Sequence, residues 1–243
     1  MQTPDPTRFI LIGTSHPGNV GAAARAMKVM GFGDLVLVAP RFADVLSQAE
    51  TLAMASGATD VLAQARVVAT LTEAMEGVSF ACATAMTPRD FGPPTHAPRE
   101  LFSTLKESTH RVAFVFGSER FGMSNDDVYR CHACLSIPTH PGYGSLNLAQ
   151  AVQLIAYDWR QALGGFSVAA RTVEPQWADG VAVQGLLEHW ERALVDIEFL
   201  DPGVPRKLMP RLNQLVNRAR LTQEEVHILR GVARAILAGS SNA

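Results

Sequence analysis

The chain has 243 residues, of which 47% are hydrophobic and 18% are charged, and its formal net charge at pH 7 is −2. The length suits one large α/β domain with a small appendage, and the near-neutral charge excludes a globally basic nucleic-acid binder, so any nucleic-acid surface has to be a local patch. No apolar run approaches the roughly 18 residues of a membrane span and the N-terminus lacks a signal-peptide pattern, so we expect a cytoplasmic protein without a membrane contact.

Five short apolar runs predict strands that are buried on both faces, at residues 9–13, 35–40, 78–84, 112–117 and 134–137. Helical patterns lie between them, at about 20–30, 47–56, 71–75 and 99–106, and a longer helix runs from about 146 to 163. Asn19 is the expected N-cap of the first helix, and Gly31 is its expected stop. Apolar strands that alternate with helices predict an α/β fold, a mainly parallel sheet with helices on both faces.

The pattern changes after residue 163. Gly164 and Gly165 end the long helix, and only helical segments follow, at 181–199, at 206–220 and after 221. We therefore expect a first domain of residues 1–165, a linker of residues 166–180 and a helical extension of residues 181–243. In the extension Thr222 and Glu225 have the spacing of a capping box.

The second helical segment of the extension is basic and has no acidic residue. Its cations are Arg206, Lys207, Arg211, Arg218 and Arg220. Such a segment is either a phosphate-binding strip or an ordinary solvated helix face, and the residues alone leave both readings open.

Three polar loops that contain glycine each follow a predicted strand, at residues 14–21, 117–122 and 138–147. Ligands of open parallel sheets bind at the carboxyl ends of the strands, so we expect the three loops to meet at one site. Ser145 occupies the expected N-cap of the long helix, where its hydroxyl faces either the first turn or a ligand. Glu119 and Asn147, at loop–helix junctions, are either local caps or ligand contacts.

Arg25 is the notable cation of the first predicted helix. Small residues share its face at helical spacing, with Lys28 one turn further on: they are Gly18, Gly21 and Ala22. A phosphate backbone is expected to approach such a face closely, whereas the alternative is an ordinary surface arginine.

Several common sites are excluded by spacing. There is no P-loop, the Gly31-Phe32-Gly33 segment precedes a strand instead of following one, and Gly117–Gly122 is not a nucleophile elbow. Cys131 and Cys134 have C-x-x-C spacing, but a zinc site needs a second ligand pair, which the sequence lacks. We expect no metal.

Taken together, the three loops resemble the three motifs of the SpoU-type branch of the SPOUT RNA methyltransferases. The first motif is N-V-G-A-A-A-R-A-M-K-V-M-G-F, which begins at Asn19 and contains Arg25. The second is V-F-G-S-E-R-F-G-M-S at residues 115–124, and the third is Ile137-Pro138 followed by S-L-N-L-A-Q-A from Ser145. The resemblance covers about residues 8–163. Residues 14–19 and 227–231 also resemble the TrmJ-type branch, which methylates the ribose of tRNA nucleotide 32.

This resemblance implies a C-terminal trefoil knot, a homodimer, and S-adenosyl-L-methionine held mostly by backbone groups. The implied cofactor-binding residues are Thr84, Ala85, Met86, Gly117, Ile137, Gly144, Ser145 and Leu146. Arg25 is the implied centre of hydroxyl activation, and Ser145, Asn147, Asn19 and Glu119 complete the implied catalytic set.

The implied partner is tRNA, with cytidine and/or uridine at position 32 as the target. Its expected contacts are Arg25, Lys28 and the basic residues of the extension. The alternatives are a 2′-O-methyltransferase for another tRNA or rRNA position, and a knotted RNA-binding protein without catalysis.

Overall fold

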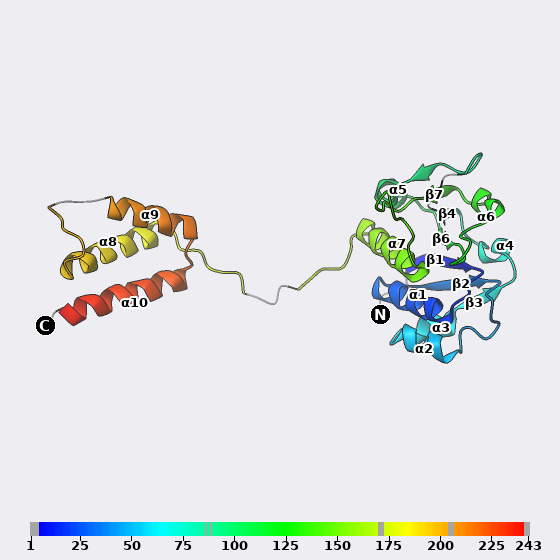
Figure 1. Cartoon of the computed structure of the whole chain (residues 1–243), viewed down its shortest axis with the longest axis horizontal. Helices are drawn as coiled ribbons and strands as arrows, with labels where there is room; N and C mark the ends of the chain where they lie inside the picture. The colour runs from blue at the N-terminus through cyan, green and yellow to red at the C-terminus, as the bar shows by residue number, and fades with distance from the viewer. Residues whose placement is uncertain (1–4, 86, 88, 170–172, 204–206, 241–243) are drawn as a thin grey trace. The chain divides into compact units, whose positions relative to one another are not determined.

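The computed structural model describes residues 5–85, 87, 89–169, 173–203 and 207–240. The chain divides into two compact units, residues 1–167 and residues 168–243 (Figure 1). Each unit has its own hydrophobic core, so each is described by itself.

The first unit is built on a seven-stranded sheet in which the paired strands are parallel, in the order β3-β2-β1-β6-β4-β7-β5. The strands are β1 (Asp5–Ile12), β2 (Phe32–Val38), β3 (Arg66–Val68), β4 (Phe80–Thr84), β5 (Thr95–His96), β6 (Val112–Phe116) and β7 (Ala133–Leu135). The five predicted strands are confirmed, with ends that shift by a few residues. The short edge strands β3 and β5 are not among the predictions.

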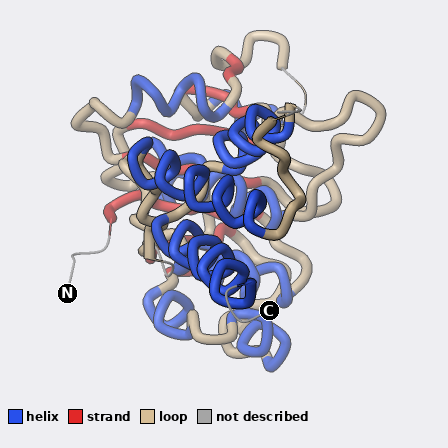
Figure 2. The backbone as a smooth tube through the Cα atoms, turned by 90° about the vertical axis from the view of Figure 1, so that its left-hand side faces the viewer, coloured by secondary structure: helices blue, strands red, loops and turns tan. Residues whose placement is uncertain are grey.

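The helices of this unit are α1 (Pro17–Val29), α2 (Ala49–Ala55), α3 (Thr59–Gln64), α4 (Leu71–Ala74), α5 (Pro98–Leu105), α6 (Asn125–Tyr129) and α7 (Leu148–Ala162). Figure 2 separates them by colour from the strands and loops. The predicted helices are confirmed, and the short helices α3 and α6 are additions. Gly31 ends α1 as expected, with a φ of 77° after the C-cap residue Met30.

Successive strand residues pack into two different cores, as a sheet covered on both faces requires. Phe9 and Leu11 of β1 belong to one core, together with Phe102 of α5 and Trp159 of α7. Ile10, between them, belongs to the other core, which also contains Leu71 of α4 and Val128 of α6. The expected helices on both faces of the sheet are therefore confirmed.

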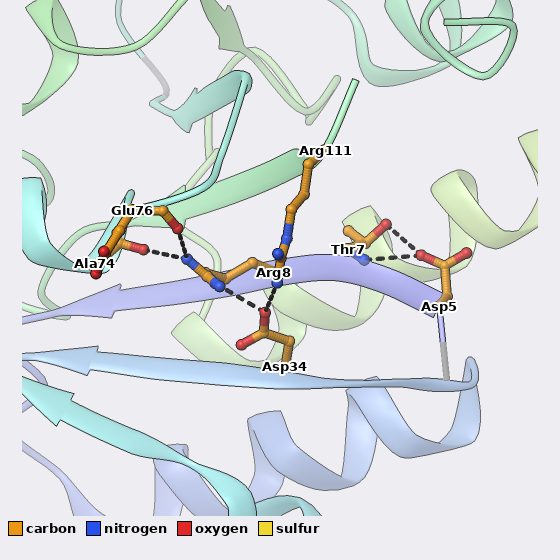
Figure 3. A network of polar contacts seen from close by, with 7 residues as sticks. All are labelled: Asp5, Thr7, Arg8, Asp34, Ala74, Glu76 and Arg111. Carbon is orange, nitrogen blue, oxygen red and sulfur yellow. Dashed lines mark hydrogen bonds and ion pairs between the residues drawn. The ribbon is translucent and has the colours of Figure 1, made fainter. Parts of the chain in front are cut away.

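A buried arginine joins β1 to β2 and to the end of α4 (Figure 3). Arg8 is 4% exposed, and its Nε lies 2.9 Å from Oδ2 of Asp34. Its Nη1 donates hydrogen bonds of 2.8 Å to the carbonyl oxygens of Ala74 and Glu76. Arg111 also reaches Asp34, at 3.4 Å. The charge of Arg8 is therefore paired and its Nε and Nη1 donors are used, which suits a buried charge.

The second unit contains α8 (Gly180–Asp196), α9 (Leu208–Ala219) and α10 (Gln223–Ser240), as predicted. Its core contains Leu186 and Leu187 of α8, Val216 of α9 and Val226 of α10. The predicted capping box is confirmed, because the amide of Glu225 donates to Oγ1 of Thr222 and the amide of Thr222 donates to Oε2 of Glu225. Within the described residues, no helix combines the length and the apolar character that crossing a membrane requires.

Candidate active site at the carboxyl ends of the strands

A cavity of about 270 Å³ opens where β4, β6 and β7 end. Its walls include seven residues that the sequence resemblance nominates for cofactor binding: Thr84, Ala85, Gly117, Ile137, Gly144, Ser145 and Leu146. Met86, the eighth nominated residue, lies outside the described residues. Segments that are far apart in the sequence therefore meet at one cavity.

Glycine at position 117 is required by the turn that follows β6. A Cβ atom there would lie 2.1 Å from the carbonyl carbon of Gly122 and 2.2 Å from the amide nitrogen of Met123. Ser118 and Gly122 close the turn with backbone hydrogen bonds of 3.1 and 2.8 Å. No side chain fits at this point, so the wall of the cavity here is backbone.

Glu119 projects from this turn and binds the loop after β1. Its Oε2 accepts hydrogen bonds of 2.9 Å from both the amide and the hydroxyl of Ser15. Its Oε1 accepts a 2.9 Å bond from Nδ2 of Asn19 and a 3.3 Å bond from the amide of His16. The second motif is therefore fastened to the first by one carboxylate.

Asn19 continues the chain of hydrogen bonds to the third motif. Nδ2 of Asn147 donates to Oδ1 of Asn19 over 3.0 Å. Oδ1 of Asn147 accepts from the amide of Ala149 at 2.9 Å, and Oε1 of Gln150 accepts from the amide of Asn147 at 3.3 Å. Glu119, Asn19 and Asn147, hereafter the loop relay, thus connect all three motifs to the first turn of α7.

Two predicted caps are corrected by these contacts. Asn147, and not Ser145, caps α7, and it does so in a capping box with Gln150. His16, and not Asn19, occupies the N-cap of α1, and Pro17 stands at its first position. Because Ser145 is not needed as a cap and lines the cavity, its ligand-facing alternative is the one that the geometry favours.

The loop relay holds Glu119 in its ionised form. Partial burial alone raises the pKa of Glu119, but the hydrogen bonds donated by Asn19 and Ser15 outweigh it and leave the pKa below the ordinary value of glutamate. Because the pKa of Glu119 is lower in the folded state, its carboxylate stabilises the fold fully at any pH above its unfolded-state pKa of about 4.3. This stabilisation is lost as the pH falls through the folded-state pKa.

We therefore expect Glu119→Gln to flatten the acid dependence of stability. From pH 6 to pH 3 the melting temperature of the wild type should fall more than that of the variant, because only the wild type has this carboxylate to protonate. Thermal unfolding across that range measures the difference. Glu107→Gln, at an exposed glutamate, is the matched control and should follow the wild type. Parallel curves for wild type and Glu119→Gln would contradict the assignment.

Arg25 is exposed on α1 and is not one of the residues that line the cavity. The close approach predicted from the small residues is made by another helix at Gly18 and Gly21, so these two positions leave no room for a phosphate backbone. Gly18 and Gly21 are buried against α2, and a Cβ on Gly21 would lie 2.1 Å from the carbonyl oxygen of Thr51. Their small size serves the close packing of α1 on α2.

The other predicted RNA contacts lie on the surface. Lys28 bonds Asp60 and the carbonyl of Gly57, each at 2.8 Å. In the second unit Arg211 and Arg218 are exposed on α9, Lys207 and Arg220 flank that helix, and Arg206 lies outside the described residues.

The cysteines are buried in the sheet core. Burial raises the pKa of the Cys131 thiol to about 12, and the nearby Cys134 adds to the effect. Over the described ranges, no group of three or more histidine, cysteine or acidic side chains is placed to hold a metal ion. Cys131 and Cys134 are thus protonated core residues at neutral pH.

The cavity is also lined by residues outside the predicted set, among them Thr87, Arg89 and Thr139. Nη1 of Arg89 donates to the carbonyl of Thr87, whereas its buried Nε has no hydrogen-bond partner among the described residues. Arg89 lies in the loop after the third predicted strand, where the resemblance implies binding through backbone groups only. A cation in that loop is the one sequence feature that points to it.

Known proteins resemble both units. The model of the SpoU rRNA Methylase family matches residues 6–157, and the model of the C-terminal domain of tRNA methyltransferase TrmJ matches residues 181–243. The tRNA (cytidine/uridine/adenosine-2′-O-)-methyltransferase TrmJ of Pseudomonas aeruginosa (strain UCBPP-PA14) is 42% identical over 242 residues, which cover 94% of this chain and 92% of that protein. The crystal structure of TrmJ from Z. mobilis ZM4 superposes with a TM-score of 0.79 at 32% identity, over 95% of this chain and 99% of the other.

The parallel sheet and the three linked loops at its carboxyl edge define a methyltransferase of the SpoU class, and S-adenosyl-L-methionine is the cofactor of that class. The helical second unit matches the C-terminal domain of TrmJ. The chain belongs to the TrmJ family of SpoU methyltransferases.

Proposed function

We propose that this enzyme methylates the ribose 2′-hydroxyl of tRNA nucleotide 32, in the anticodon loop, on cytidine and/or uridine. The observation that carries the proposal is the cavity lined by the second and third motif loops, to which the first motif is bound through Asn19. The tRNA substrate and the 2′-oxygen are supported by the names of relatives that align over nearly the whole chain. Position 32 is supported by the sequence resemblance alone.

The cavity suits S-adenosyl-L-methionine. Phe116, Leu135 and Leu148 supply buried apolar surface, and the turn at Gly117 exposes backbone where a side chain cannot stand. Arg89 brings a cation with an unused buried donor, which suits a carboxylate. When bound, the cofactor supplies a methyl group on a positively charged sulfur.

The protein has to hold the ribose oxygen in line with the methyl group and to stabilise the negative charge that develops on it. We assign the first task to Ser145, which lines the cavity, with Asn19, Asn147 and Glu119 holding the surrounding loops. A guanidinium group keeps its proton at physiological pH, so Arg25 serves as a donor and not as a base. It clamps the phosphate beside the target ribose, or donates to the nascent oxyanion, and a phosphate oxygen or water takes the proton that the hydroxyl loses.

The remaining parts of the proposal concern tRNA binding outside the cavity, the domain limits and the homodimer. Arg211, Arg218, Arg220, Lys207 and Arg206 are proposed to bind tRNA phosphates outside the cavity, and Lys28 joins them if its bridge to Asp60 opens. The domain limits of 1–165, 166–180 and 181–243, the homodimer, the trefoil knot and a cytoplasmic location stay predictions.

One experiment tests the function in its natural setting. Ribose methylation is mapped across total tRNA from a strain that lacks the gene, with and without the gene restored. Loss at nucleotide 32 that the restored gene repairs is the expected result. A loss at another tRNA position or in rRNA would replace position 32 with that site, and an unchanged map of both RNAs would refute the proposal.

A further inference from the structure

Three strongly exposed aromatic side chains lie next to cavity-lining residues along the chain. Phe91 is 101% exposed, Phe121 79% and Tyr143 76%. No other described aromatic residue of the first unit exceeds the 55% of Phe166. Each of the three lies within two positions of a residue that lines the cavity, namely Arg89, Gly122 and Gly144. The most exposed aromatic rings of this unit therefore flank the candidate active site.

Phe121 lies in the Ser118–Gly122 turn, which hydrogen bonds fix to the loop after β1. The amide of Phe121 donates to Oγ of Ser118 at 3.2 Å, inside the turn that Ser118 and Gly122 close. Glu119, two positions earlier, is fastened inward by the loop relay. The guanidinium carbon of Arg120 lies 5.2 Å from the centre of the Phe121 ring. The turn thus directs its carboxylate into the loop relay and presents an aromatic ring with a cation on it.

The other two rings also stand on hydrogen-bonded turns. The amide of Tyr143 donates to the carbonyl of His140 at 3.0 Å, and the amide of Gly142 donates to Nδ1 of His140 at 3.1 Å. Phe91 has a φ of 59°, and the amide of Gly92 after it donates to the carbonyl of Arg89 at 2.9 Å. All three rings are therefore exposed by defined backbone geometry.

We propose that Phe121, Tyr143 and Phe91 are stacking platforms for unpaired nucleobases next to the nucleotide whose ribose enters the cavity. Single exposed apolar side chains are common and need no explanation. Three strongly exposed rings, each next to a residue that lines the same cavity, need one. Unpaired RNA is recognised by stacking of its bases on aromatic rings and on arginine planes, with cations nearby for the phosphates. Phe121 with Arg120 supplies that combination.

The inference rests on the proposed function, since it names what the same site reads in its RNA. A protein surface is the other class of partner that exposed rings can contact. The arginine stacked on Phe121 favours a ligand that carries both flat bases and negative charge, which is an RNA loop. Because the rings lie outside the cavity lining, they act on RNA affinity and leave cofactor affinity unchanged.

The test uses the full-length protein and an unmodified tRNA transcript that the wild type methylates. Phe121→Leu and Tyr143→Leu keep apolar bulk but remove the aromatic face, and Phe121→Trp keeps a face. We expect each leucine variant to weaken tRNA binding by about 5- to 100-fold, the range that stacking of one base provides. Phe121→Trp should stay within about 2-fold of the wild type, and calorimetry should give an unchanged affinity for S-adenosyl-L-methionine.

Tyr157→Leu is the matched control, since it makes the same change at a 44% exposed aromatic residue of α7 away from the cavity. It should bind tRNA as the wild type does. If the wild type methylates the transcript and the leucine variants bind it normally, the stacking inference is overturned and the function stands. Failure of Phe121→Trp to retain binding would also overturn stacking, because that variant keeps an aromatic face. A wild type that binds no cofactor and methylates no tRNA would instead refute the proposed function.

Discussion

Replacement of Arg25 by lysine is expected to lower the turnover of tRNA methylation by about 100-fold or more, the loss typical of removing one donor to developing charge. Lysine keeps the positive charge but loses the planar pair of donors that binds a phosphate or an oxyanion at two points. The affinity for S-adenosyl-L-methionine should not change, because Arg25 is exposed on α1 and does not line the cavity.

Single-turnover methylation with saturating cofactor measures the first effect, and calorimetry with S-adenosyl-L-methionine measures the second. Arg66→Lys is the matched control, since Arg66 is an exposed arginine on the edge strand β3. It should retain full turnover. Near-normal turnover in Arg25→Lys would remove Arg25 from the proposed mechanism, and a parallel loss in Arg66→Lys would show that the effect is not local.

The largest effect on stability is expected at Arg8. Arg8→Leu removes the charge paired with Asp34 and leaves the carbonyl oxygens of Ala74 and Glu76 without their donor. Breaking a buried ion pair from one side costs about 3–5 kcal/mol. We expect the lower end of that range, because Asp34 is 25% exposed and keeps Arg111 at 3.4 Å.

Urea unfolding, followed by a probe in the first unit, measures this loss. Arg99→Leu breaks the 3.0 Å bridge between Arg99, whose side chain is 81% exposed, and Asp158. That control should cost less than about 1 kcal/mol, as exposed pairs do. The double variant Arg8→Leu/Asp34→Leu should recover part of the loss, since it also removes the carboxylate that has lost its nearer partner. Equal losses in Arg8→Leu and Arg99→Leu would contradict the structural role of Arg8.

The strands that the sequence predicts are those with buried side chains on both faces, because a continuous apolar run is visible without any knowledge of partners. The edge strands β3 and β5 escape prediction since they have three and two residues and are largely exposed at Arg66, Val67 and Thr95. Their structure comes from pairing with β2 and β7, which is tertiary information.

The two corrected caps have a sharper explanation. Ser145 and Asn147 are both good cap residues, so residue type alone cannot choose between them. Gln150, three residues after Asn147, completes a capping-box pattern and is the sequence signal that distinguishes them. At the other end of the relay, Pro17 at the first position of α1 marks the helix start two residues before Asn19.

The glycines of α1 show that helical spacing in the sequence does not identify the neighbour that a helix face contacts. Gly18 and Gly21 share a helix face with the position of Arg25, and the sequence does not say whether a ligand or another helix approaches that face. The carbonyl of Thr51 on α2 occupies the space a Cβ of Gly21 would need. Close approach is correctly indicated by the small residues, while the identity of the neighbour requires the fold.

The loop relay has a thermodynamic consequence for ligand binding. Three separate loops would each have to lose backbone freedom when a ligand arrives, and that ordering would subtract from its affinity. Glu119, Asn19 and Asn147 impose the order during folding instead, through bonds that lie entirely within the protein. The binding free energy at this cavity is therefore available for contacts with the ligand, and cutting the relay should appear as an entropic penalty on binding.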